Sequence, residues 1–375
     1  QLLGGVFADT RLVVAPAPRG ATAVRVEGPA LEGAVLAQAD SAAPLAGKFE
    51  RVYWRAPAAT AGAGAAVAAP AATTTAAAAN PIDASFDPAK VPPLTIDIAD
   101  LRLGDARMGS ARVRTRPTAT GMRLEQIQTR GDKQAIDISG DWSGRGAAAR
   151  TRLSMNIDSG DTGALLGSFG FGGLVAGGKA KIRFDAGWPG SPAAFALGSL
   201  DGGLTLDVRD GRLLEVEPGT GRVIGLLSIA QLPRRLGLDF RDLFSKGFAF
   251  NRVGGHIAIG GGSARSDDLV MDGPAATVNI RGATNLRAQS YDQTIEVRPK
   301  TGNLLTAVGA IAAGPVGAAI GAAAGTVLQK PLSGIGAKTY RVTGPWKEPK
   351  VEVMTREQSR AADAAVRGGA GRTAL

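Results

Sequence analysis

The stretch Leu94-Thr95-Ile96-Asp97-Ile98 alternates strictly between aliphatic and polar residues, and this pattern decides the fold. Successive side chains of a β-strand point to opposite faces of the sheet. Leu94, Ile96 and Ile98 therefore share one face, while Thr95 and Asp97 share the other. Such a strand predicts a sheet with one apolar face and one polar face.

The same alternation recurs along most of the chain. Turns that contain Gly, Asp or Pro, such as Asp210-Gly211 and Asp272-Gly273-Pro274, separate most of the strands. This order predicts a mainly β chain that forms a long twisted antiparallel sheet. The predicted strands lie at residues 23–27, 49–54, 94–98, 112–115, 135–139, 153–157, 179–185, 204–209, 256–259, 277–281, 294–298, 340–343 and 351–353.

Helices are few in this interpretation. An Asp N-cap predicts a short helix over residues 161–166, and apolar spacing predicts two more over 223–230 and 240–248. These helices are too few to cover a sheet of about a dozen strands, and exposed apolar surface costs about 25 cal/mol per Å². The sheet either closes on itself as a sandwich or barrel, or leaves an open groove that a ligand with hydrocarbon tails covers. Periodicity does not choose between the two.

An uncharged segment lies between Lys300 and Lys330. Gly314-Pro315 divides it, which predicts an apolar helical pair over residues 303–313 and 315–329. Three interpretations stay open: a buried pair at the end of the sheet, a tip that touches or enters a membrane, or a membrane-spanning anchor. The candidate membrane-contact residues are Leu304, Leu305, Val308, Ile311, Val316, Ile320, Val327 and Leu328.

The composition of the 375-residue chain restricts its chemistry. It has a net charge of +10, 53 glycines, 5% aromatic residues and no cysteine, so disulfides and thiolate metal sites are excluded. His256 is the only histidine, which disfavours zinc sites built on several histidines, and we expect no metal and no cofactor. Ile257 and Ile259 define the apolar side of their strand, so we expect His256 on the polar side.

The charged residues point to a solvated face rather than to a catalytic or nucleic-acid-binding site. Arg112, Arg114 and Arg116 fall on polar strand positions, which predicts a wet sheet face or a diffuse attraction to anionic lipid head groups. Nucleic-acid binding would need clustered basic residues with stacking aromatics, so we expect no nucleic-acid partner. The carboxylate pairs at 267–268 and 239/242 are interpreted as caps or exposed charges, and the chain is not predicted to be an enzyme.

Composition also predicts the order of domains. Residues 56–89 are rich in Ala, Thr and Pro and predict a linker or loop. Residues 1–55 are expected to be strands that continue a groove from a preceding part. The main β-groove with short helices is predicted over 90–300, the apolar helical segment over 301–330, closing strands over 331–354, and a disordered tail over 355–375.

Several stretches resemble the C-terminal region of the YhdP family, which lies in the AsmA-like superfamily together with TamB. They are residues 188–192, 207–219, 236–250, 268–276, 291–294 and 340–346. The resemblance is strong over 90–354 and looser over 1–89. It implies a periplasmic protein of Gram-negative bacteria, held in the inner membrane by an N-terminal helix that this sequence lacks. Its C-terminal end is expected near the outer membrane, with residues 303–329 as the helical element at that end.

The resemblance further implies transport of phospholipids between the inner and outer membranes, with acyl chains in an apolar β-groove. It supplies no catalytic residues. An alternative is a scaffold or assembly factor for outer-membrane proteins, with envelope proteins as partners; a polysaccharide-binding sandwich and a hydrolase based on His256 are weaker hypotheses. The candidate groove-lining residues are Leu94, Ile96, Ile98, Val113, Ile136, Ile138, Leu153, Met155, Ile157, Ile182, Phe184, Leu204, Leu206, Val208, Ile257, Ile259, Val278, Ile280, Ile295 and Val297.

Overall fold

A computed structural model describes residues 7–40, 42–55, 87–104, 106–167, 172–214, 247–300, 337–346, 348–355 and 357–358. Within these ranges seventeen strands and a few short helices form, which confirms the prediction of a mainly β chain. The chain divides into two compact units. Unit 1 comprises residues 1–172 and 180–203, unit 2 comprises residues 173–179 and 204–375, and each is described by itself.

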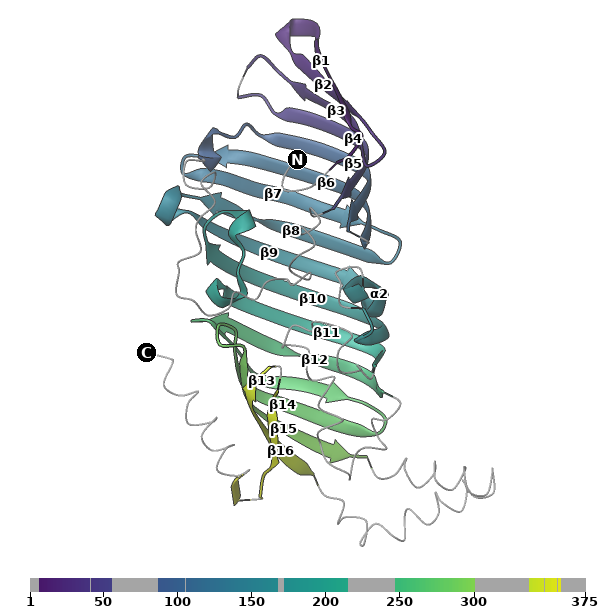
Figure 1. Ribbon diagram of the computed structural model, residues 1–375, viewed down its shortest axis with the longest axis vertical. Helices are drawn as coiled ribbons and strands as arrows, with labels where there is room; N and C mark the ends of the chain where they lie inside the picture. The colour runs from purple at the N-terminus through teal and green to yellow at the C-terminus, as the bar shows by residue number, and fades with distance from the viewer. Residues whose placement is uncertain are drawn as a thin grey trace, which may run out of the picture. The chain divides into compact units, whose positions relative to one another are not determined.

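Unit 1 is an open sheet whose strands follow the order of the chain (Figure 1). Nearly every neighbouring pair is antiparallel. Unit 1 also contains β10 from residue 180 onward. The strands are β1 Arg11–Pro16, β2 Thr22–Glu27, β3 Leu31–Ala37, β4 Leu45–Trp54, β5 Leu94–Leu103, β6 Ala106–Thr118, β7 Gly121–Arg130, β8 Gln134–Ser143, β9 Arg150–Ser159 and β10 Val175–Pro189.

One pair departs from the predicted antiparallel order. β4 and β5 are parallel, with Leu45 opposite Leu94 and Trp54 opposite Leu103. The alternation of apolar and polar residues is the same in parallel and antiparallel strands, so it carries no information on strand direction. The expectation of a wholly antiparallel sheet is therefore wrong at this pair.

The strand registers of unit 1 build a continuous apolar face. Residues directly opposite one another on paired strands point to the same side of a sheet. Two rows of such residues cross six strands from β5 to β10. The first row is Ile96, Val113, Ile127, Ile138, Met155 and Phe184, and the second is Ile98, Ala111, Thr129, Ile136, Ile157 and Ile182.

A hydrophobic cluster of unit 1 lies on this face. Ala106, Met108 and Ile136 are buried and form its centre. Half-buried apolar side chains surround them, namely Leu101, Leu103, Ile138, Met155 and Ile157. Side-by-side contacts of this kind remove apolar surface from water and hold neighbouring strands in register.

Irregular positions in the strands keep the apolar face continuous. The register of β7 shifts between Leu124 and Ile127, so these two residues lie on the same face although they are three positions apart. Gly109 in β6 has a φ of +75°, and a Cβ atom there would overlap the carbonyl oxygen of Arg130. Only glycine fits this position without moving the backbone of the next strand.

Short helices join some of the strands. The predicted helix at 161–166 is confirmed as α2 Thr162–Leu166, and Asp161 caps it by accepting a hydrogen bond of 3.0 Å from the amide of Ala164. The other helices among the described residues of unit 1 are single 3₁₀ turns. They are η1 Pro18–Gly20, η2 Pro88–Lys90, η3 Gly146–Ala148, η5 Pro192–Ala194 and η6 Leu197–Ser199.

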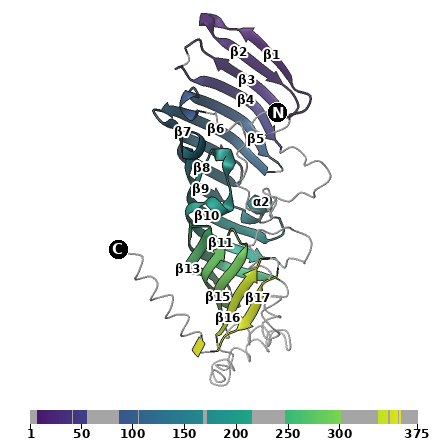
Figure 2. The same cartoon turned by 60° about the vertical axis from the view of Figure 1, so that its left-hand side comes forward.

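Unit 2 contains the C-terminal strands, which from β12 onward pair antiparallel in chain order (Figure 2). Its central row runs from Leu269 through Ile280, Ile295 and Tyr340 to Val353. Unit 2 contains β11 from residue 204 onward. The strands are β11 Asp201–Leu213, β12 Phe248–Gly260, β13 Ser263–Asp272, β14 Ala276–Asn285, β15 Ser290–Pro299, β16 Lys338–Pro345 and β17 Lys350–Val353.

Two local predictions are wrong in unit 2. Asp210-Gly211 lies inside β11 rather than in a turn, and Asp210 adopts a φ of +55° there. Phe248 opens β12, so a helix over 240–248 cannot include it. The rest of that helix lies outside the described residues. So do the helix predicted at 223–230, the helical pair at 303–313 and 315–329, most of the linker at 56–89, and most of the tail at 355–375.

Candidate functional site

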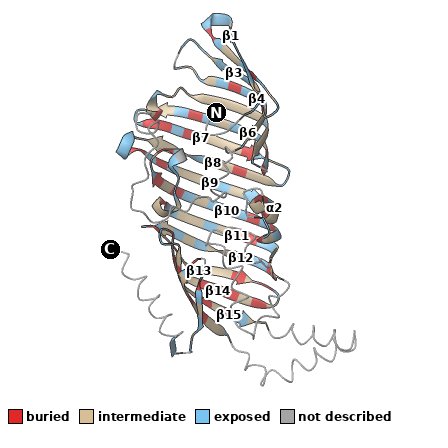
Figure 3. Ribbon diagram, viewed as in Figure 1, coloured by how far each residue is buried: buried red, intermediate tan, exposed pale blue. Residues whose placement is uncertain are grey.

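The apolar face of unit 1 combines a hydrophobic surface with access to its side chains. Ile136 is buried, with 5% of its surface exposed. The other predicted lining residues of unit 1 are half-buried, and Figure 3 shows the mixture of burial along these strands. They pack against their neighbours on the sheet while part of each side chain stays accessible. These residues are Leu94, Ile96, Ile98, Val113, Ile138, Leu153, Met155, Ile157, Ile182 and Phe184.

The same face continues over the first four strands, where sequence reasoning named no lining residue. The strand registers extend the second row beyond Ile98, through Phe49, Gly33 and Val26, to Leu12 on β1. Leu12 is 65% exposed. The alternation at 23–27 was the available signal, since it already gave Val26 a defined side of its strand.

Sequence reasoning also missed the contribution of β7. Met122, Leu124 and Ile127 lie on the apolar face, opposite Trp142, Gly140 and Ile138. Their spacing of two and then three residues breaks the period of two that marks a strand. An apolar-x-apolar-x-x-apolar pattern inside a predicted sheet is the signal that could have found them.

In unit 2 the predicted lining residues divide into two groups. Val278, Ile280, Ile295 and Val297 on β14 and β15 are buried, with at most 6% of their surface exposed, and Val208 is also buried. The remaining four, Leu204, Leu206, Ile257 and Ile259, are half-buried. The first group fills a core, so its side chains offer little surface to a ligand.

The polar face of unit 1 is organised by ion pairs between strands. Arg112 donates to Asp97 over 2.8 Å, and Arg130 donates to Asp137 over 2.7 Å. Hydrogen bonds from Ser154 and Arg183 hold the pKa of Asp185 below its usual value. These pairs are exposed and contribute little to stability, but they keep this face hydrated.

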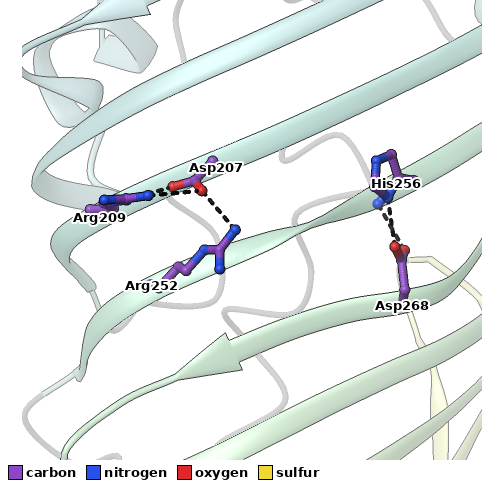
Figure 4. A network of polar contacts seen from close by, with 5 residues as sticks. All are labelled: Asp207, Arg209, Arg252, His256 and Asp268. Atoms are coloured by element: carbon purple, nitrogen blue, oxygen red, sulfur yellow. Dashed lines mark hydrogen bonds and ion pairs between the residues drawn. The ribbon is translucent and has the colours of Figure 1, made fainter.

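Two sets of paired polar side chains lie on strands β11 to β13 of unit 2 (Figure 4). Arg209 and Arg252 both donate to Asp207, over 2.9 and 2.8 Å, and the hydrogen bond from Arg209 is the main cause that lowers the pKa of Asp207. His256 contacts Asp268 over 2.6 Å, with 71% of its side chain exposed, which agrees with the predicted polar side.

The arrangement around His256 does not match a hydrolytic triad. Nucleophilic catalysis needs a serine bonded to the imidazole, with the carboxylate on the other ring nitrogen. Here Ser266 donates to Asp268 over 3.4 Å, so the carboxylate lies between the serine and the imidazole. The pair bridges β12 and β13 beside a register shift, where it ties the two strands together.

The described residues form neither a metal site nor a membrane-spanning helix. In the part of the chain that the structure describes, there is no cluster of three or more His, Cys, Asp or Glu side chains that could hold a metal ion. No helix among the described residues has the length and apolar character needed to cross a membrane. The predicted membrane-contact residues, from Leu304 to Leu328, lie outside the described residues.

An open sheet with an accessible apolar face on one side and ion pairs on the other defines a β-sheet protein whose two faces differ in chemistry. A model of one protein family, described as "YhdP protein", matches residues 1–351. The chain belongs to the YhdP family, which confirms the resemblance in the sequence.

One curated relative is the "Intermembrane phospholipid transporter YhdP" of Escherichia coli (strain K12). It is 26% identical over 223 residues, which cover 59% of this chain and 18% of the relative. The chain thus spans about one fifth of the length of that protein. No solved structure matches the chain.

Proposed function

We propose that this chain is part of a protein that carries phospholipids between the two membranes of a Gram-negative cell envelope. Acyl chains lie in a groove formed by the apolar face of unit 1, while head groups stay in water at the ends of the strands. The observation that carries the proposal is the pair of apolar rows from Ile96 to Phe184 and from Ile98 to Ile182. The rows cross six strands with Thr129 as their one polar member, and most of their side chains keep an accessible part.

The energetics favour a hydrocarbon occupant for this face. Each 100 Å² of apolar surface left in water costs about 2.5 kcal/mol, and an acyl chain gains about 0.8 kcal/mol for every methylene that it buries. A lipid tail that lies along the rows removes water from the protein surface and from itself. No covalent step is involved, so we propose a passive, non-catalytic role without cofactors.

The name of the E. coli relative supports phospholipid as the cargo and the cell envelope as the location. We further propose that the full-length protein is anchored in the inner membrane by an N-terminal helix. In this proposal the region described here lies near the outer membrane, and residues 301–330 contact it. Envelope proteins are its proposed partners.

Native mass spectrometry of the chain purified from a Gram-negative host tests this function. We expect protein ions that carry phospholipid, and reloading of the stripped protein from phosphatidylethanolamine vesicles. The proposal would be refuted by a chain that circular dichroism shows to be folded but that carries no phospholipid and accepts none from vesicles.

A second function, assembly of outer-membrane proteins, is favoured by the edge strand β1. Among the described residues β1 pairs only with β2, and Leu12 and Val14 are 65% and 67% exposed. An exposed strand edge can add a strand from another chain. A photo-crosslinker at Val13 would then capture unfolded barrel proteins, whereas a lipid carrier would show no such product.

A further inference from the structure

The polar face of β6 to β9 carries a concentration of arginine that strand pairing alone does not explain. Arg116 lies directly opposite Arg123, Arg123 opposite Asp141, and Asp141 opposite Arg152. Like charges directly opposite each other on a sheet are destabilising. A sequence selected for sheet stability alone would place a carboxylate or a neutral residue at one of the two positions.

We define the arginine patch as Arg114, Arg116, Arg123, Arg150 and Arg152, all exposed on the polar face by alternation and register. Two carboxylates lie within it. Glu125 accepts from Arg116 over 2.7 Å, and Asp141 stands between two arginines of the neighbouring strands. Five guanidinium groups against two carboxylates leave an excess of positive charge on one small area of the sheet.

A hollow of about 460 Å³ borders the patch. Arg114 and Glu125 belong to its wall, and the register shift of β7 between Leu124 and Ile127 lies beside it. The rest of the wall contains Ile138, the carboxylate of Asp137, and amide and hydroxyl groups that can donate and accept hydrogen bonds. The amide and hydroxyl groups belong to Gln126, Gln128, Ser139 and Asn156.

We infer that the arginine patch forms a docking surface for an acidic segment of a partner protein. Every basic residue of β6 to β9 is an arginine, and none is a lysine. Arginine is enriched at protein interfaces, where its planar group binds carboxylates through two parallel hydrogen bonds, whereas lysine is depleted there. Attraction to a bilayer surface makes no such distinction, since lysine and arginine serve equally.

The face opposite the patch supports the same assignment. The apolar rows lie on the other side of these strands, so the tails of a bound lipid and the arginine patch occupy opposite faces of the sheet. A partner bound to the patch would hold the protein in place while the apolar face stays free.

The experiment measures binding of a fluorescent polyglutamate peptide to the chain. The double variant Arg123→Glu/Arg152→Glu is compared with Arg25→Glu/Arg265→Glu, which changes the net charge equally at exposed strand arginines outside the patch. We expect binding to weaken about tenfold or more in the patch variant and about twofold or less in the control. Circular dichroism and urea unfolding establish that both variants are folded.

Three outcomes would overturn the inference. Equal loss of affinity in the two variants would show a general effect of net charge. Absence of peptide binding even at low salt, about 50 mM, where exposed charges are little screened, would show that no docking surface exists. Arginine-dependent sedimentation with vesicles of phosphatidylcholine and phosphatidylglycerol, without a change in peptide affinity, would assign the patch to a bilayer instead.

Discussion

Ile157 offers the sharpest test of an open apolar face, because its neighbour Asn156 points to the other side of the same strand. Ile157 lies opposite Ile136 and Ile182 and is half-buried, while Asn156 is exposed on the polar face. Ile157→Asp places a carboxylate among the apolar rows, and Asn156→Asp adds the same charge to the polar face. If an acyl chain crosses Ile157 and loses two to three methylene contacts, binding weakens by roughly 2 kcal/mol, about 30-fold.

Stability should respond differently from lipid binding. A carboxylate at half-buried Ile157 keeps contact with water, so we expect a loss of about 1 kcal/mol in the free energy of unfolding. Val278 is 6% exposed, so Val278→Asp combines about 2 kcal/mol of lost burial with about 3 kcal/mol for an unpaired buried charge. Phospholipid per protein is measured by native mass spectrometry, and stability by urea unfolding.

The lipid loads and stabilities of the three variants distinguish an open apolar face from a closed core. We expect Ile157→Asp to lose lipid with modest destabilisation, Asn156→Asp to keep both properties, and Val278→Asp to fold poorly. If Ile157→Asp destabilises the chain as much as Val278→Asp does, its face is a closed core and not a binding surface. A lipid load equal to that of Asn156→Asp would also refute the reasoning.

Three further results are expected. Gly109→Ala should destabilise the chain by about 2 kcal/mol or more in urea unfolding, because a Cβ at its positive φ overlaps the Arg130 carbonyl; an unchanged midpoint would contradict this. Asp161→Ala should cost about 1 kcal/mol near neutral pH, since its carboxylate caps α2. The hydrogen bond from the amide of Ala164 lowers the pKa of Asp161, so this contribution is present above about pH 4 and is lost as the pH falls through the lower folded-state pKa. Thermal melts of the wild type and the variant between about pH 2 and 7 should show this loss. A difference in melting temperature that stays constant over this range would contradict it. His256→Ala should leave the phospholipid load unchanged, and a loss of bound lipid would show that the exposed pair with Asp268 serves binding.

Sequence alone was sufficient for the strands whose alternation is uninterrupted. The period of two at 94–98, 153–157 and 277–281 gives both the element and the side of each residue, because strand geometry leaves no other choice. The strands β7 and β13 were missed since each contains a register shift that breaks the period, at Leu124/Ile127 and at Ser266/Leu269.

The alternating pattern does not predict how deeply each apolar side chain is buried. Ile157 and Val278 have the same alternating context, yet one is half-buried and the other is in a core. The difference depends on which side chains pack above each face, and that is a property of the tertiary structure. Likewise the arginine patch arises from the pairing of Arg116 with Arg123 across two strands, which no single stretch of sequence displays.

The parallel pairing of β4 and β5 has a topological consequence. Because Leu45 faces Leu94 and Trp54 faces Leu103, the connection leaves at one end of the pair and must re-enter at the other, about 30 Å away. The connection must span this distance, which takes at least about nine extended residues of almost any composition. Shortening it to a tight hairpin would reverse the direction of β5 and of every strand that follows. The connection can therefore change in composition and in length, as long as it still joins the far ends of the two strands.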